Sequence, residues 1–393
     1  MLRHTFLDYL VMNRVFPFII YLLLLSACTS AVPEPDQESK QEPSPLPDTV
    51  FLQDPVGSYV RGVDCSWLTE QEEDGVLFAD SLGTPMECMR LMRLYGINAM
   101  RLRVWVNHST GWCNPDDVLR KARRARDLGY RLMIDFHYSD YFCDPSQQTT
   151  PQAWKDYDLN QLCQALTTHT CDVLQSLKQE DITPEWIQVG NETRNGMCWP
   201  SGQLWDTNGD IEGGWTRYAS LELAGYNAVK SIFPDAKVIV HLNDAYQDNN
   251  WFYRRLKQEG GKFDIIGLSH YPMQTEWSGK TWQQMNSEAI THMTALHNEF
   301  DCPIMLCEVG TLGDKQQEQT SRRVLEELLP TLHKNDWFAG AFYWEPQVFD
   351  NWRPAEYINL GWNAYNMGAF KTLRVQDKIY GTPNEAFIFL AKP

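Results

Sequence analysis

Several signatures that would assign this 393-residue chain to a function class are missing or weak. Basic residues are in deficit, 34 against 51 acidic ones, which gives a net charge of −17 and argues against a nucleic-acid partner because phosphates would be repelled. The chain contains no CxxC pair, so a zinc ribbon is disfavoured. The segment RGVDCSW lacks a GxGxxG loop, which disfavours a doubly wound nucleotide-binding sheet. No composition break divides the chain after its N-terminal segment.

The N-terminal segment lacks an apolar run that is long enough to span a bilayer comfortably. Residues 1–27 are predicted to be an export signal, with Arg3 and Arg14 before an uncharged run and small residues after it. The sequence LSAC resembles a bacterial lipobox, so Cys28 is the expected lipidated residue, with a plain secretory signal as the alternative. Residues 28–55 are rich in Pro and acidic residues and are expected to be a flexible tether. The protein is therefore expected to be exported and anchored by lipid, with the outer membrane and the cell surface as the expected location.

Nine further cysteines follow Cys28, and their odd number and irregular spacing do not indicate a small disulfide-stapled fold. Most are expected to be small buried apolar side chains, while an exported location allows one or two disulfides.

The remaining chain, residues 56–393, repeats short β-rich runs followed by longer stretches with helical spacing. Eight strands alternating with helices predict a single closed (β/α)8 TIM barrel of the α/β class. The eight runs are Tyr59–Cys65, Asn98–Trp105, Arg131–His137, Trp186–Asn191, Val238–Leu242, Ile265–His270, Ile304–Glu308 and Ala339–Trp344. The helix-like stretches include Pro115–Leu128, Leu159–Lys178, Trp215–Ile232, Trp282–Phe300 and Thr320–His333.

Polar and aromatic residues stand where these runs end, and the ends of barrel strands share one face. Glu192 directly follows the fourth run and Glu308 ends the seventh, on roughly opposite sides of the barrel mouth. Two facing carboxyl groups are what glycoside cleavage requires, one as acid and one as nucleophile or base. A separation of about 5–5.5 Å would give retention of configuration.

The neighbours of the two glutamates are expected to set their different protonation states. If the arginines of the second run face the lumen, Arg103 lies nearer the mouth than Arg101 and can keep one glutamate ionised. His270 or Tyr271 could hydrogen-bond the same carboxylate, and Asn191 could bind a sugar hydroxyl. Glu345 directly follows the eighth run, but a structural or substrate-contact role is at least as plausible for it as a catalytic one. A metal site at Asp135 and His137 is disfavoured because the first run lacks the His-x-His of metal-dependent barrel hydrolases.

The motifs RGVDCSWL, NAMRLRVW, DFHYSD with a following DP, WIQVGNET, IIGLSHYP and FYWEP resemble glycoside hydrolase family 53, from about Tyr59 onward. The resemblance implies a retaining endo-β-1,4-galactanase acting on β-1,4-galactan or type I arabinogalactan. It implies Glu192 as acid/base and Glu308 as nucleophile, with Arg103 and Asn191 assisting. The other expected substrate contacts are His137, Asp140, His270, Tyr271, Trp344 and Trp199.

The chain departs from the family pattern at Phe142-Cys143, where the family usually has Trp-Ala, so the sugar subsite there is expected to differ. Some bacterial relatives hold calcium after the seventh strand, but the segment GTLGDKQQEQTSRR is short, so no metal or cofactor is predicted. Trp112, Trp199, Trp205 and Trp277 follow strand ends and are candidate platforms for further galactose units. The alternatives are a clan relative acting on mannan or cellulose, a glycan-binding lipoprotein on an inactive barrel, and a metal-dependent hydrolase.

Overall fold

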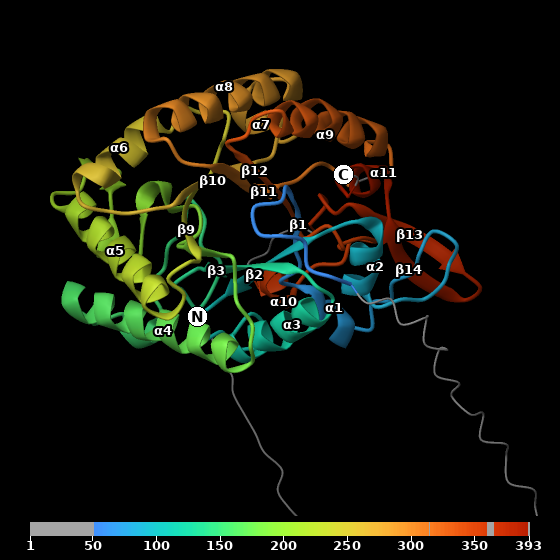
Figure 1. Ribbon diagram of the computed structural model, residues 1–393, viewed down its shortest axis with the longest axis horizontal. Helices are drawn as coiled ribbons and strands as arrows, with labels where there is room; N and C mark the ends of the chain where they lie inside the picture. The colour runs from blue at the N-terminus through green and yellow to red at the C-terminus, as the bar shows by residue number, and fades with distance from the viewer. Residues whose placement is uncertain (1–50, 314, 360–364, 392–393) are drawn as a thin grey trace, which may run out of the picture. The chain divides into compact units, whose positions relative to one another are not determined.

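The computed structural model describes residues 51–313, 315–359 and 365–391, and within them eight parallel strands form a closed barrel (Figure 1). Each strand pairs with the next barrel strand in the chain, and the last pairs with the first. The predicted TIM barrel is therefore confirmed, and each strand overlaps one predicted run. The strands are β1 (Val60–Asp64), β2 (Ala99–Val104), β3 (Arg131–Phe136), β4 (Trp186–Val189), β9 (Lys237–Leu242), β10 (Ile265–His270), β11 (Ile304–Val309) and β12 (Phe338–Trp344).

Helices surround the barrel, and the longest ones begin close to where helical spacing begins in the sequence (Figure 1). Asn114 caps the third helix ahead of Pro115, while Asp158 and Thr281 form capping boxes with Gln161 and Gln284. The predicted helices are α3 (Pro115–Asp127), α4 (Leu159–Gln179), α5 (Gly214–Ile232), α8 (Trp282–Phe300) and α9 (Glu318–His333). The others are α1 (Leu68–Glu73), α2 (Cys88–Tyr95), α6 (Asn250–Gln258), α7 (Thr275–Ser278), α10 (Ala355–Asn359), α11 (Glu385–Leu390) and the 3-10 turns η1 (Gln152–Trp154) and η2 (Thr193–Asn195).

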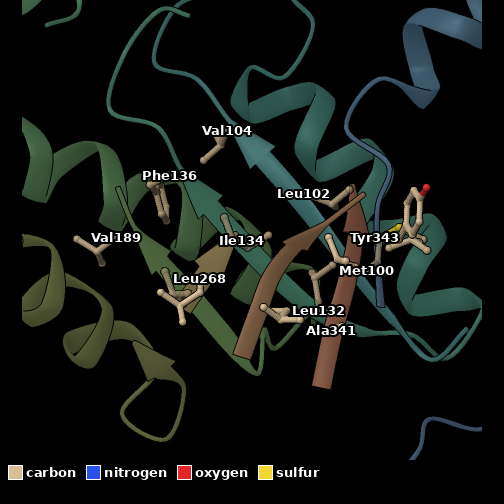
Figure 2. Close-up of a cluster of buried hydrophobic side chains, with 14 of the residues drawn as sticks. Met100, Leu102, Val104, Leu132, Ile134, Phe136, Val189, Leu268, Ala341 and Tyr343 are labelled. Atoms are coloured by element: carbon tan, nitrogen blue, oxygen red, sulfur yellow. The ribbon is translucent and has the colours of Figure 1, made fainter. Parts of the chain in front are cut away.

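Alternate side chains of each barrel strand point to opposite faces. One set, which includes Leu102 on β2 and Ile134 on β3, packs with helix residues such as Val118 and Leu166 in one large apolar cluster (Figure 2). The other set fills the lumen near the strand starts. Gly62 leaves room there for Phe342, because a Cβ on Gly62 would lie 2.3 Å from the Phe342 ring. The lumen is therefore solid below the mouth.

A β-bulge interrupts the alternation on β11. Leu306 is opposite Leu268, but the next residue of β10, Ser269, is opposite Glu308, so Cys307 is the additional residue. Cys307 packs with Met305 in the lumen cluster, and Glu308 also reaches lumen residues, as described below. The bulge therefore turns two successive side chains toward the lumen.

Three small hairpins extend the barrel ends. Two lie between β4 and α5 and are formed by β5 (Gly196–Met197) with β6 (Gly202–Gln203) and by β7 (Trp205–Asp206) with β8 (Gly209–Asp210). The third, β13 (Phe370–Val375) with β14 (Lys378–Pro383), contacts the segment after α1 through a bridge between Gly381 and Phe78.

The nine cysteines after Cys28 are all free, so the possible disulfides are not found. Six of them are buried, as expected for small apolar side chains: Cys65, Cys88, Cys113, Cys143, Cys198 and Cys307. In the described part of the chain, no helix has the length and apolar character needed to cross a membrane. The predicted signal segment, Cys28 and the tether up to residue 50 lie outside the described residues.

Candidate active site

A cavity of about 190 Å³ opens at the end of the barrel where the strands finish. Seven of the predicted site residues line it: Arg103, His137, Asn191, Glu192, Tyr271, Glu308 and Trp344. A larger cavity of about 420 Å³ lies at the opposite end, where the strands begin. Because barrel chemistry is carried by residues that follow the strand ends, the cavity with the two glutamates is the candidate active site.

Glu192 stands on a sharp turn between β4 and η2. Its φ of 46° is in the left-handed region, and Gly190 two residues before it has a φ of 81°. A side chain on Gly190 would also meet Thr193 at 2.6 Å, so the tight turn requires glycine there. A non-glycine residue with a positive φ is a form of local strain that is concentrated at functional sites.

The pKa of the Glu192 carboxyl is raised well above its usual value, first by burial and then by the negative charge of Glu308. A hydrogen bond from the side chain of Ser269 is the largest opposing influence. Glu192 is therefore the carboxyl group that tends to keep its proton, as a general acid must.

Glu308 is buried, whereas Glu192 is half-buried, and Glu308 has much stronger partners for its charged form. The Tyr271 hydroxyl donates a hydrogen bond to Oε2 at 2.7 Å, and Nη2 of Arg101 lies 3.0 Å from Oε1. Burial still raises the pKa of Glu308, while Arg101 and then Tyr271 act to lower it. Of the two glutamates, Glu308 is thus the one whose ionised form has the stronger partners.

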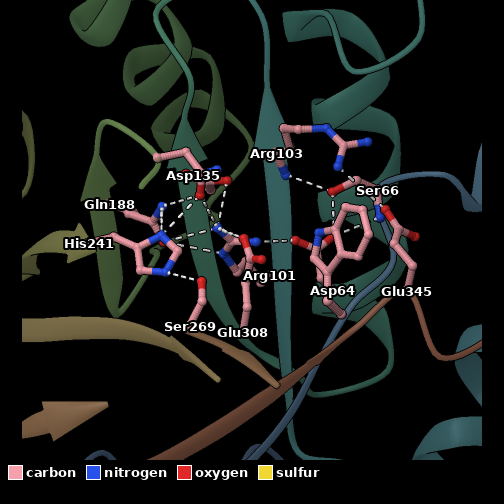
Figure 3. Close-up of polar contacts among 12 residues, drawn as sticks. Asp64, Ser66, Arg101, Arg103, Asp135, Gln188, His241, Ser269, Glu308 and Glu345 are labelled. Carbon is pink, nitrogen blue, oxygen red and sulfur yellow. Dashed lines mark hydrogen bonds and ion pairs between the residues drawn. The ribbon is translucent and has the colours of Figure 1, made fainter. Parts of the chain in front are cut away.

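Arg101 is at the centre of the polar layer of the lumen (Figure 3). Besides Glu308, its guanidinium contacts Asp64 at 2.6 Å and Asp135 at 2.8 Å. It also donates to the side-chain oxygens of Gln188 and Asn191 at 3.1 and 2.9 Å. The planar fork of arginine suits this set of acceptors from several strands. Burial alone would lower the pKa of Arg101, but the attraction of the surrounding carboxylates outweighs it and raises the pKa well above the usual value.

The expectation that Arg103 holds a catalytic glutamate ionised is wrong in its choice of arginine. Arg103 and Glu345 form a pair at 3.5 Å instead (Figure 3). The Arg103 guanidinium lies over the rings of Phe142 at 4.6 Å and Trp105 at 5.0 Å. The lower arginine, Arg101, reaches Glu308 because the seventh-strand bulge brings the carboxylate into the lumen layer rather than above it. Arg103 still lines the cavity, beside the aromatic wall.

Glu345 follows β12 and lies beneath the cavity wall rather than in the cavity lining. It is fully buried, and its carboxylate accepts hydrogen bonds from Trp67 N at 3.2 Å and Gln347 Nε2 at 2.7 Å. Burial raises its pKa to about 8. These contacts indicate a structural role for this third strand-end glutamate.

Asn191 and His137 are positioned by hydrogen bonds on several sides. Asn191 Oδ1 accepts from Arg101 and from Gln188 Nε2 at 3.0 Å, and its Nδ2 donates to Cys143 O at 2.7 Å. His137 Nδ1 accepts the backbone N–H of Cys143 at 2.9 Å. The ring proton is therefore on Nε2, which lies 3.0 Å from Asp135 Oδ2, and burial lowers the pKa of His137. Both side chains are held in fixed orientations at the cavity wall.

Aromatic side chains form one wall of the cavity. Trp344 and Tyr357 line it, and both pack edge-on against the buried Trp67, at ring-centroid distances of 4.9 and 5.3 Å. Phe142 lines the same wall and packs against Trp67 at 6.2 Å. Phe142 belongs to the Phe142-Cys143 pair that differs from the family pattern, and it lies at the cavity, where the sequence predicts an altered subsite.

Three predicted contacts do not line the cavity. His270 points away from the lumen and bonds Asn286 of α8 at 2.9 Å, because its neighbour Ser269 takes the inward position. The Asp140 carboxylate accepts the backbone N–H groups of Asn107 and Gln152, which ties the loops after β2 and β3 together. The indole of Trp199 donates to Asn195 O at 2.8 Å within the loop after β4. These three residues therefore lie outside the lining of this cavity, and their contact with substrate stays a prediction.

The sequence did not point to Asp144, Gln274, Tyr357 and Met367, which complete the lining. Tyr357 stands on the short helix α10 and Met367 on the loop before β13, where no periodic pattern marks a functional position. The alternation along β10 would have indicated that His270 is turned outward. In the described residues, no group of three or more His, Cys, Asp or Glu side chains could hold a metal ion. The absence of a cofactor remains a prediction.

Comparison with known proteins adds to this geometry. The model of glycosyl hydrolase family 53 matches residues 60–379. The arabinogalactan endo-β-1,4-galactanase of Thermothelomyces thermophilus is 33% identical over 313 residues, which cover 74% of this chain and 90% of that protein. The enzyme of the same name from Cellvibrio japonicus is 32% identical over 312 residues, covering 72% and 79%. A solved structure of a fungal β-1,4-galactanase has a TM-score of 0.71 and 25% identity, over 86% of this chain and 99% of the other.

Proposed function

Because the chain belongs to glycosyl hydrolase family 53, we propose that it hydrolyses β-1,4-galactosidic linkages within galactan or type I arabinogalactan chains, with retention of configuration. The family assignment makes it a glycoside hydrolase, and the named relatives support galactan as the substrate. The observation that carries the roles of the glutamates is their unequal environment. Glu308 is held by Arg101 and Tyr271, whereas Glu192 is half-buried beside the charge of Glu308.

In the first step the Glu308 carboxylate attacks the anomeric carbon, and the bond from that carbon to the glycosidic oxygen breaks. Glu192 gives its proton to the departing oxygen, so the leaving chain departs as a neutral alcohol. In the second step Glu192, now ionised, takes a proton from water. The water oxygen then attacks the anomeric carbon and releases Glu308. Two inversions restore the original β configuration.

Chemical rescue tests the two roles separately. An aryl β-galactobioside with a good leaving group is given to Glu308→Ala and Glu192→Ala with added azide. In Glu308→Ala, azide takes the place of the missing carboxylate and attacks the anomeric carbon with inversion, which gives the α-galactobiosyl azide. With Glu192→Ala it intercepts the covalent intermediate and gives the β-azide. Glu212→Gln, an exposed carboxylate in the same loop, is the control. The reverse pattern of anomers would exchange the roles, and near-normal galactan hydrolysis by either variant would refute the proposal.

A polysaccharide panel tests the substrate. Reducing sugar should be released from β-1,4-galactan and not from mannan or cellulose. Release from mannan alone would favour a clan relative. Tight galactan binding with no release would favour a glycan-binding protein. The anomer formed first, followed by NMR, tests retention.

We also propose that the protein is lipid-anchored through Cys28 after removal of residues 1–27, with the outer membrane and the cell surface as the location. The support is the sequence of the signal-like run and of LSAC alone. Replacing Cys28 with Ser should move the protein from the membrane fraction into the soluble exported fraction. Unchanged membrane association of that variant would contradict the anchor.

A further inference from the structure

Three tryptophans from separate segments form a cluster beside the loop after β4. The ring centroids of Trp205 on β7 and Trp251 on α6 are 6.2 Å apart, and those of Trp215 on α5 and Trp251 are 6.1 Å apart. Trp251 has an exposed fraction of 40% and is among the exposed large apolar side chains. Trp205 and Trp215 are half-buried. An exposed aromatic cluster of this kind is a feature of binding surfaces.

The cluster lies at the same end of the barrel as the two glutamates. Trp215 and Trp251 stand in the first turns of α5 and α6, the helices that follow β4 and β9. Helices of a (β/α)8 barrel begin near the ends of the preceding strands, which is the face that carries the active site.

The turn that follows Glu192 is hydrogen-bonded to the segments that carry Trp205 and Trp251. Asn195 of η2 is buried, accepts the backbone N–H of Trp205 at 2.9 Å and donates to Trp205 O at 3.1 Å. Arg194 of the same turn donates to Asn249 Oδ1 at 2.5 Å, and Asn249 directly precedes the helix that carries Trp251. The cluster is thus connected through two or three residues to the proposed acid.

The position beside the acid gives the direction in which a bound chain would run. The acid protonates the glycosidic oxygen, which stays with the leaving part of the polymer. Surface adjoining the Glu192 turn is therefore expected to contact the leaving part. This step depends on the proposed function.

We propose that Trp205 and Trp251 form a binding platform for galactosyl residues on the leaving-group side of the cleaved bond. The occupant is a neutral polymer, which the net charge of −17 does not repel, whereas an anionic one would be repelled. Exposed Asp206 and Asp210 on the β7–β8 hairpin stand beside Trp205, where their carboxylates can accept hydrogen bonds from sugar hydroxyls.

The test compares two substrates on the full chain. Galactan places sugar units on the leaving-group side, whereas an aryl β-galactobioside places only the aryl group there. For Trp251→Ala, the ratio of kcat/KM on galactan to kcat/KM on the aryl substrate should fall about tenfold, mainly through KM. Trp205→Ala should do the same. Tyr157→Ala, which removes an aromatic ring with an exposed fraction of 42% from another loop, should leave the ratio unchanged.

Binding measured without turnover separates the platform from the chemistry. In Glu308→Ala, calorimetric titration with long β-1,4-galacto-oligosaccharides should show about tenfold weaker affinity once Trp251→Ala is added. An unchanged ratio and unchanged affinity in folded Trp251→Ala and Trp205→Ala would overturn the platform while the proposed function stands. If the unaltered protein does not hydrolyse galactan, the proposed function is refuted instead. Should Trp251→Ala unfold, Trp251→Leu keeps apolar volume without the flat ring and should show the same loss.

Discussion

Arg101 and Glu308 form a buried ion pair of 3.0 Å in the middle of the barrel mouth, with side-chain exposed fractions of 1% and 8%. The same guanidinium contacts Asp64 and Asp135, both of which are fully buried. One arginine thus compensates three carboxylates from three strands. This arrangement links the stability of the barrel to the protonation state of the proposed nucleophile.

Replacing Arg101 by Ala should therefore destabilise the fold as well as reduce activity. Asp64 and Asp135 would remain buried without their cation, and removing one partner of a buried pair costs about 3–5 kcal/mol. Urea denaturation measures the loss of unfolding free energy. Arg123→Ala, which removes an exposed arginine paired with Glu180, is the control and should change little. Equal stability of the two variants would contradict a central role for Arg101.

Replacing Tyr271 by Phe should affect activity without a comparable loss of stability. The variant removes only the hydroxyl that bonds Glu308 at 2.7 Å. Since that hydrogen bond lowers the pKa of Glu308, its loss raises the pKa, and the acidic limb of the kcat/KM profile should move to higher pH. A net cost of about 1.5–3 kcal/mol for a hydrogen bond to a charged group corresponds to roughly a 10- to 150-fold loss. An unshifted acidic limb would mean that Glu308 is not the group titrating there.

The pH dependence of stability should reflect Glu70 on α1. Its Oε1 accepts the backbone N–H of Ala355 at 2.8 Å, and burial raises its pKa to about 7. Between an unfolded value of about 4.3 and that folded value, the native state binds more protons than the unfolded state. The free energy of unfolding should therefore fall as pH rises from about 5 to 7.

Urea titrations at several pH values compare the native chain with Glu70→Gln, which keeps the acceptor oxygen and removes the titrating group. The variant should show a shallower decline than the native chain. A residual slope is expected from Glu345, whose pKa is raised to about 8. Glu73→Gln removes an exposed carboxylate of the same helix and is the control. Identical slopes for all three proteins would contradict the contribution of Glu70.

Adding a side chain at Gly62, at the base of the lumen, should destabilise the fold. A Cβ there would lie 2.3 Å from the Phe342 ring, so Gly62→Ala should cost about 1–3 kcal/mol through overpacking. Thermal unfolding measures the loss. Adding Phe342→Leu to Gly62→Ala should cost less than the sum of the two single changes, because the smaller side chain makes room for the methyl group. Simple additivity would show that the two positions do not compete for space.

Much of this protein could be predicted from the order of its residues. The eight β-rich runs fall on the eight barrel strands, because strands buried on both faces leave a local apolar signal. The ends of those runs carry Glu192, Glu308, Asn191 and Tyr271, and the barrel brings these to one cavity. Local patterning was sufficient here since the position of a strand end in a closed barrel depends only on strand order.

The tertiary structure alone decided which side chains meet. The bulge at Cys307 turns Glu308 inward out of the regular alternation, and its partner is Arg101 rather than Arg103. Such pairings depend on the register between neighbouring strands. A one-residue shift in register turns the side chains to the opposite face, and the sequence of one strand does not specify the register. The contacts of Tyr357 and of the Trp205–Trp251 pair likewise join segments that are distant in the chain. The sequence therefore determined the scaffold and its catalytic carboxyl candidates, while register and loop packing determined their partners.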